Sequence, residues 1–191
     1  FNKEYDYQTE FDWLNRELVF DYAKKLQQLT ELVLQDSQMQ DISTLANLTQ
    51  LVEINFCENK IQDISALEGL INLNELWLKD NQIQDISVLA NLTKLTMFDL
   101  SENKIQDISV LSDLTSLNEI GLQNNQIQDI SALGNLVNLN YLFLNNNQIK
   151  DIYALSNLNN LKYLTLYNNP INYQDIKWLQ QKLQNCEIVF Y

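Results

Sequence analysis

The chain has 191 residues, and its 25 acidic and 12 basic side chains give a formal net charge of −13. It contains no histidine and only two cysteines, which excludes histidine-dependent catalysis, histidine metal ligation and a four-cysteine zinc site. The acidic balance argues against a nucleic-acid partner, because carboxylates repel phosphate backbones. No uncharged apolar stretch is long enough to span a membrane.

The first segment, residues 1–28, lies outside the pattern that fills the rest of the chain. The letters TEFD at residues 9–12 resemble a capping box with Asp in its last position. Apolar residues then recur at helical spacing, at Phe11, Leu14 and Leu18. The sequence therefore predicts a helical N-terminal cap over about 9–28, with its apolar side on the following unit.

A 22-residue repeat fills residues 29–160 in six consecutive units. Each unit reads LxxLxLxxNxIxDISxLxxLxx, and a seventh unit starts at Leu161 and ends differently. The inner LxL has a period of two, which predicts a strand with one buried face. The closing IxxLxxL has a period of three, which predicts a short 3-10 or irregular return.

Two polar positions of the repeat have structural explanations. The Asn at position nine is expected to turn inward and pair with backbone N–H and C=O groups that the turn after each strand leaves free. The Asp at position thirteen lies just before the apolar turn, where its oxygens can accept hydrogen bonds from free N–H groups. Both rows of side chains are therefore interpreted as architecture. The first unit departs from the pattern, with Ser37 in place of Asn.

The last segment, residues 161–191, combines a final repeat strand with a C-terminal cap. Asn172 offers a second helix start, and residues 186–190 are predicted to form a last strand. Between them, one helical face is lined by Ile176, Leu179 and Leu183.

This repeat resembles the leucine-rich repeat family, and its LxxLxLxxNxIxDIS unit is similar to the 22-residue repeat of bacterial internalins. It is also similar to the repeat of a eukaryotic protein phosphatase regulator, although the C-terminal cap looks more like those of internalins. The resemblance implies an α/β fold: a curved solenoid with a parallel sheet on its concave side and 3-10 or irregular segments on its convex side.

Positions three, five and seven of each unit are expected to point to the concave face. Early units place a row of Glu there and late units place aromatic side chains, which mark contact surfaces. Two plainer interpretations stay open: the rings pack along neighbouring strands, and the Glu row is a solvated face copied by duplication. The predicted partner-binding residues are Glu31, Glu53, Glu75, Trp77, Met97, Asp99, Glu119, Tyr141, Phe143, Tyr163 and Tyr167.

These patterns predict a non-enzymatic protein-binding module whose concave face is acidic in its N-terminal half and aromatic in its C-terminal half. The resemblance leaves two alternatives, a regulatory subunit of a protein phosphatase and an internalin-like surface adhesion domain. Glu75 and Asp99 lie on an open sheet that implies no pocket, so catalysis is not expected. No metal and no cofactor is expected either.

The expected partner is a protein with a basic patch, which the Glu row would steer onto the face. The chain itself is expected to be a monomer without a membrane span. Cys57 and Cys186 are expected to lie about five repeats apart and to remain free thiols, because a disulfide needs Cα atoms within about 7 Å. Free thiols indicate a reducing compartment or an extracellular protein that does not use disulfides, so the location stays open, with the cytoplasm slightly favoured over a secreted or surface location.

Overall fold

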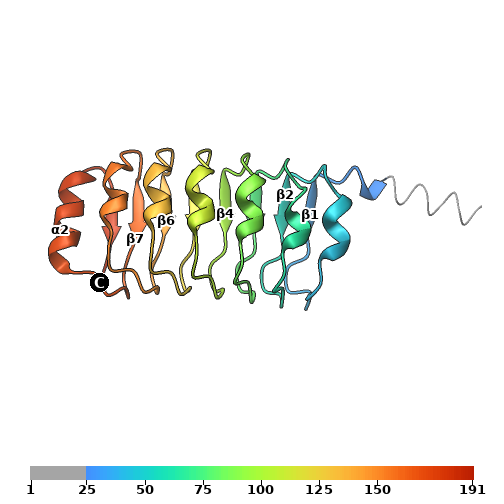
Figure 1. The fold of residues 1–191 in the computed structure, drawn as a ribbon, viewed down its shortest axis with the longest axis horizontal. Coiled ribbons are helices and arrows are strands. Elements are labelled where there is room, and N and C mark those ends of the chain that lie inside the picture. Colours follow the sequence, from blue (N-terminus) through green and yellow to red (C-terminus); the bar gives the residue numbers. More distant parts are fainter. Residues whose placement is uncertain (1–24) are drawn as a thin grey trace, which may run out of the picture.

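The computed structural model describes residues 25–191 of the chain. Eight short strands form one parallel sheet, in which each strand pairs with the next one along the sequence. The repeats stack along one axis from the first strand to the last (Figure 1). The strands are β1 (Glu31–Val33), β2 (Glu53–Asn55), β3 (Glu75–Trp77), β4 (Met97–Asp99), β5 (Glu119–Gly121), β6 (Tyr141–Phe143), β7 (Tyr163–Thr165) and β8 (Glu187–Val189).

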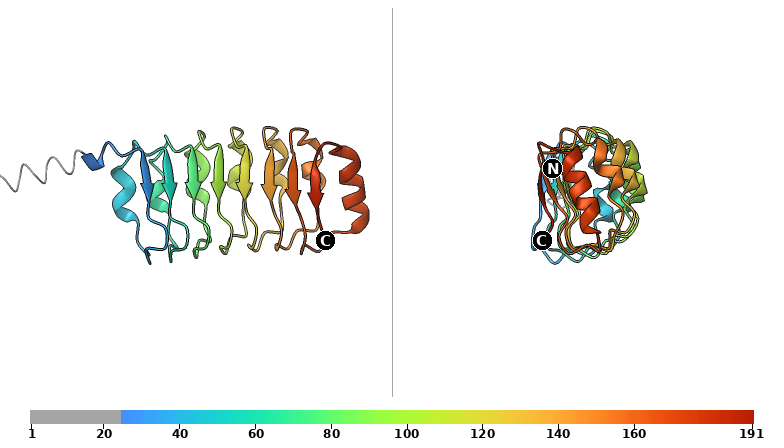
Figure 2. Two further views of the ribbon diagram at one scale, coloured as in Figure 1. Left: turned by 180° about the vertical axis from the view of Figure 1, so that it is seen from behind. Right: turned by 90° about the vertical axis from the view of Figure 1, so that its left-hand side faces the viewer.

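The return side of each repeat is a single 3-10 segment, because 22 residues leave no room for a longer helix beside a strand and two turns. In the end-on view these segments lie opposite the sheet (Figure 2). This confirms the expected parallel sheet with 3-10 returns. The segments are η1 (Ser43–Asn47), η2 (Ser65–Leu67), η3 (Ser87–Asn91), η4 (Ser109–Asp113), η5 (Ser131–Asn135) and η6 (Tyr153–Asn157).

The inward positions of the repeat build one continuous core between the sheet and the 3-10 segments. From Leu51 to Leu166, every residue at positions one, four, six, eleven, fourteen, seventeen and twenty is buried. Phe56 and Phe98 are the largest of these fully buried side chains. Burying one such side chain stabilises the fold by about 1.5–3 kcal/mol, so the repeat pattern itself supplies the main driving force for folding.

The Asn at position nine joins consecutive repeats as expected. Asn103 Oδ1 accepts a hydrogen bond from the Ile83 N–H at 2.9 Å, and its Nδ2 donates to the carbonyls of Leu78 and Leu100 at 3.0 and 3.1 Å. Asn103 is buried, so the amide satisfies backbone groups that water does not reach. The same pattern recurs at Asn59, Asn81, Asn125, Asn147 and Asn169.

The Asp at position thirteen closes a short turn before each 3-10 segment, also as expected. Asp85 Oδ1 accepts a hydrogen bond from the Ser87 N–H at 2.8 Å. This bond lowers the pKa of Asp85, because the N–H stabilises the ionised carboxylate. The turn recurs at Asp41, Asp63, Asp107, Asp129 and Asp151.

The C-terminal end of the solenoid is closed by a helix and a strand. Helix α2 (Tyr173–Lys182) begins at Asn172, whose side chain accepts a hydrogen bond from the Gln174 N–H at 2.8 Å. The predicted cap helix and last strand are therefore confirmed, and α2 lies beside η6 at the end of the stack (Figure 1). Its inner face buries Ile176, Leu179 and Leu183.

The predicted N-terminal cap helix over about 9–28 lies outside the described residues, apart from its last four positions. Within residues 25–191, no helix has the length and apolar character needed to cross a membrane.

Candidate functional site

The outer face of the sheet, which the sequence predicts to be the concave face, is called the sheet face from here on. The first and third residues of each strand point to it, because side chains alternate along a strand. Strand register aligns the first residues in one row and the third residues in a second row. Ten of the eleven predicted contact residues lie in these rows, and Tyr167 lies two residues beyond β7.

The acidic end of the first row is formed by Glu31, Glu53 and Glu75, which are direct register neighbours on β1, β2 and β3. Neighbouring strands lie about 4.8 Å apart, so the three carboxylates repel one another. Burial raises the pKa of Glu53, and the charges of Glu31 and Glu75 add to that shift. Within the described part of the chain, none of the three carboxylates has a hydrogen-bond or ion-pair partner.

The aromatic end of the sheet face lies on β6 and β7. The rings of Phe143 and Tyr163 are 5.8 Å apart and tilted by 53°, a spacing at which aromatic pairs attract each other. Tyr141 lies beside Tyr163 in the first row and remains 38 % exposed. Tyr167 is half-buried at the exit of β7. The rings thus contact one another as the plainer interpretation expects, and they still present apolar surface to solvent.

A hollow of about 240 Å³ lies at the centre of the sheet face, where the sequence implied no pocket. Gly121 is one of its lining residues, and the Asp99 carboxylate lies over it, because a Cβ added at Gly121 would lie 2.6 Å from Asp99 Oδ1. Trp77 and Phe143 lie in the same row as Gly121, one on each side of it. Trp77 is two strands away from Gly121, and Phe143 is one strand away. The remaining lining residues are Phe98, Asp99, Glu119 and Gln123.

The sequence predicts Trp77, Asp99, Glu119 and Phe143 on this face. It does not predict that these four residues line one hollow. Gly121 and Gln123 were missed as site residues. The available signal was a lone glycine between a carboxylate and an aromatic ring in the second row, since every other unit carries a larger side chain there.

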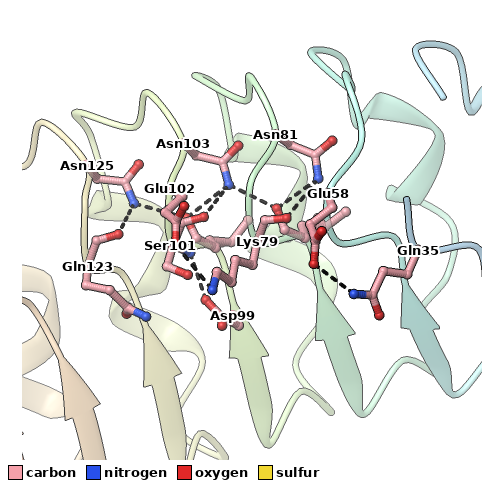
Figure 3. A network of polar contacts seen from close by, with 12 residues as sticks. Gln35, Glu58, Lys79, Asn81, Asp99, Ser101, Glu102, Asn103, Gln123 and Asn125 are labelled. Carbon is pink, nitrogen blue, oxygen red and sulfur yellow. Dashed lines mark hydrogen bonds and ion pairs between the residues drawn. The ribbon is translucent and has the colours of Figure 1, made fainter. Parts of the chain in front are cut away.

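The strand exits carry a polar network that the sequence did not predict (Figure 3). Lys79 Nζ lies 3.2 Å from Glu102 Oε1, and this contact raises the pKa of Lys79. Gln35 Nε2 donates a hydrogen bond to Glu58 Oε1 at 2.8 Å. Glu58 and Glu102 therefore have partners within the chain, whereas the Glu row has none among the described residues. The Glu row therefore contributes free negative charge to this region.

Some positions expected on the concave surface are buried instead. Thr165 Oγ1 donates a short hydrogen bond to Asn145 Oδ1 at 2.6 Å, and both side chains are covered. Ser101 is fully buried as well. Small side chains at positions five and seven lie below their longer neighbours, so the usable face is narrower than the repeat pattern suggests.

Hollows of about 340 and 520 Å³ lie on the opposite side of the solenoid, between successive 3-10 segments. They are lined by the same QDIS positions in neighbouring repeats, including Asp107, Asp129 and Asp151. Such grooves follow from the 22-residue period itself, and these carboxylates hold the turns. We therefore place the candidate site on the sheet face, where the side chains change from unit to unit.

Metal and redox sites are not apparent in the described residues. Within residues 25–191, no three Cys, Asp or Glu side chains converge on a point where they could hold a metal ion. Cys57 and Cys186 are free thiols, as the spacing predicts. Burial raises the pKa of both thiols, that of Cys186 to about 11.

Comparisons with known sequences and structures agree on one protein family. A family model described as Leucine Rich repeats (2 copies) matches residues 27–69, 50–91, 71–113, 93–135 and 137–181. No curated protein matches the chain.

Among solved structures, an internalin (InlF) from Listeria monocytogenes is 34 % identical with a TM-score of 0.82. That match covers 87 % of this chain and 48 % of InlF, so the chain spans about half of InlF. Internalin C2 from the same species is 34 % identical with a TM-score of 0.79, covering 85 % of this chain and 71 % of that one.

A leucine-rich-repeat protein of Leptospira interrogans is 26 % identical with a TM-score of 0.66, and the match covers 85 % of this chain and 46 % of that protein. All three solved structures share the repeat solenoid, and the family model matches well over half of the sequence. The chain belongs to the leucine-rich repeat family.

Proposed function

We propose that this chain is a non-enzymatic module that binds a partner protein on its sheet face. The observation that carries the proposal is the contrast between the two sides of the solenoid. The turn side repeats the same polar residues in each unit, whereas the sheet face presents side chains that the fold does not require. Exposed aromatic rings of this kind are typical of contact surfaces.

The two ends of the sheet face play different roles in the proposal. The aromatic end at Tyr141, Phe143 and Tyr163 supplies apolar contact area, because large rings bury much surface at little entropic cost. The Glu row at Glu31, Glu53 and Glu75 attracts basic side chains and orients the partner, an effect that acts mainly on the association rate. The partner is then a protein whose own surface runs from basic to apolar.

The test is a triple substitution, Trp77→Ala, Phe143→Ala and Tyr163→Ala, in the full chain used as immobilised bait in the native lysate. We expect the triple variant to retain proteins captured by the natural chain at least about tenfold less well, since loss of hot-spot rings costs 2 kcal/mol or more. Circular dichroism and thermal unfolding establish that the variant still folds.

The matched control removes apolar surface elsewhere. Ile71 and Val137 are 54 % and 47 % exposed and lie off the sheet face. The double variant Ile71→Ala, Val137→Ala should capture the same proteins as the natural chain. Unchanged capture by the folded triple variant would show that the sheet face is not the binding surface.

A further inference from the structure

The hollow at the centre of the sheet face has apolar walls and polar acceptors. Trp77 on β3 and Phe143 on β6 both line it, with Asp99 and Gly121 on the two strands between them. Both rings are half-buried. A flat, partly apolar group entering the hollow would therefore have an aromatic ring within reach.

The acceptors in this hollow lack partners within the described residues. Asp99 Oδ1 accepts the Ser101 N–H at 2.8 Å, which leaves its other carboxylate oxygen free. Glu119 makes no side-chain hydrogen bond or ion pair in residues 25–191, and burial beside Asp99 raises its pKa. The side-chain amide oxygen of Gln123, Oε1, is buried and has no hydrogen-bond partner in the described residues either. A buried acceptor without a donor is costly, so the hollow is suited to a ligand that brings several donors.

No cationic side chain of the described region lines the hollow. The cation nearest along the sheet, Lys79 on the neighbouring strand exit, is engaged with Glu102 at 3.2 Å (Figure 3). Asp99 and Glu119 thus face the hollow from adjacent strands, and Lys79 interacts with the charge of Asp99 as well as with Glu102. Because Lys79 is already paired with Glu102, a cation on the bound molecule would balance the remaining negative charge of the hollow.

We propose that this hollow receives one arginine side chain of the partner protein, an inference that rests on the proposed function of the sheet face. A guanidinium is planar, stacks on aromatic faces and carries five donors in a fixed fork. Asp99 and Glu119 offer carboxylate acceptors for that fork, and Trp77 or Phe143 offers an aromatic face. A lysine ammonium is a compact point charge with three donors, so it uses fewer of these groups.

The test is NMR titration of the full ¹⁵N-labelled chain with acetyl-Gly-Arg-Gly-amide and its lysine and citrulline analogues. The readout is the indole N–H resonance of Trp77, identified with a Trp77→Phe variant. We expect a saturable shift with the arginine peptide, at least threefold weaker binding of the lysine peptide, and no shift with citrulline, which keeps the shape and loses the charge. Weak dissociation constants, in the millimolar range, are expected for one side chain.

Two variants remove the site in different ways. Asp99→Asn with Glu119→Gln removes the charge and keeps the shape, and Gly121→Ala displaces the Asp99 carboxylate, which lies 2.6 Å from the added Cβ. Each should weaken arginine-peptide binding at least tenfold. Glu31→Gln with Glu53→Gln removes two charges at the far end of the Glu row and should change the affinity by less than twofold. Thermal unfolding of every variant reports on folding.

The proposal is overturned if the arginine peptide leaves the Trp77 resonance unmoved up to about 50 mM, if citrulline binds equally well, or if the carboxylate variant binds like the natural chain. Failure of the proposed function is a separate result, in which the Trp77, Phe143 and Tyr163 triple variant still captures the partner. If the triple variant loses the partner and no peptide binds, the sheet face is the contact surface and the hollow is not an arginine site.

Discussion

At the scale of single residues, position eight of the repeat has a left-handed backbone in every unit. The φ angles at Asp36, Glu58, Asp80, Glu102, Asn124, Asn146 and Asn168 lie between 49° and 58°. Asn and Asp tolerate this conformation because their short polar side chains bond locally, and glutamate lacks that advantage. The chain makes these turns without glycine, at a conformational cost where the residue is Glu.

We therefore expect Glu58→Asn to stabilise the fold. The gain should be about 0.5–1 kcal/mol, because φ stays at 58° and Asn tolerates it better. The measurement is the free energy of unfolding from urea titration. The reverse change, Asn124→Glu at the same φ, is the matched control and should destabilise by a similar amount. Equal stability of all three proteins would contradict this explanation of the turn.

At the scale of elements, the repeat letters were enough to predict the strands and the 3-10 returns, and the apolar spacing after Asn172 was enough to predict the C-terminal cap helix. The alternation around Leu76 and Leu78 predicts the buried side of β3, and the Asp85 turn predicts where η3 begins. These features depend on residues close in sequence, so periodicity reveals them. The Lys79–Glu102 pair was missed because it depends on side-chain reach between neighbouring repeats, which no local pattern encodes.

The C-terminal cap gives a prediction at this scale. Leu179 is fully buried between α2 and the last repeat, and Trp178 packs edge-on against Tyr153 with ring centroids 4.6 Å apart. Leu179→Ala should lower the free energy of unfolding by about 2–5 kcal/mol through the cavity it leaves. Because repeats contact only their neighbours, hydrogen exchange should rise in α2, η6 and β8 first.

The exposed neighbour in the same helix provides the control. Gln180→Ala should leave both the free energy of unfolding and the exchange pattern nearly unchanged. Uniform loss of protection over all repeats in Leu179→Ala would mean that the cap and the solenoid unfold as one unit.

At the scale of the whole molecule, the net charge of −13 is unevenly distributed. Some of it holds turns, as at Asp85, and some is paired, as at Glu102. The Glu row neither holds turns nor has ion-pair partners among the described residues. Burial and the like charges of its neighbours raise the pKa of Glu53. A folded-state pKa above the unfolded one means that ionisation of Glu53 destabilises the fold as pH rises through that range.

We expect Glu53→Gln to raise the free energy of unfolding at pH 7 by about 0.5 kcal/mol, since it removes repulsion between side-by-side charges. The gain should shrink as pH falls through the raised pKa and vanish well below the ordinary value of 4.5, where Glu53 is protonated in both states. Urea unfolding at several pH values checks this. Glu68→Gln, on the turn side, removes the same charge and should give no such pH-dependent gain.

The hollow on the sheet face was the feature that the sequence predicted least well. The periodicity predicted that Trp77 and Phe143 lie on one face. Nothing in the repeat pattern indicated that both line the same hollow. The glycine at position 121 can be read from the sequence. The gathering of side chains from four strands around one hollow depends on side-chain packing, which the repeat pattern does not encode.

Hydroxyl-radical footprinting of the chain, with and without its captured partner, tests our claim that a partner protein binds the sheet face. Reactive side chains lie on both sides of the solenoid, Trp77, Met97 and Phe143 on the sheet face and Tyr153 and Trp178 away from it. We predict that the partner protects the first three and leaves the other two as reactive as in the free chain. Protection of Tyr153 and Trp178 with unchanged oxidation of Trp77, Met97 and Phe143 would contradict the claim.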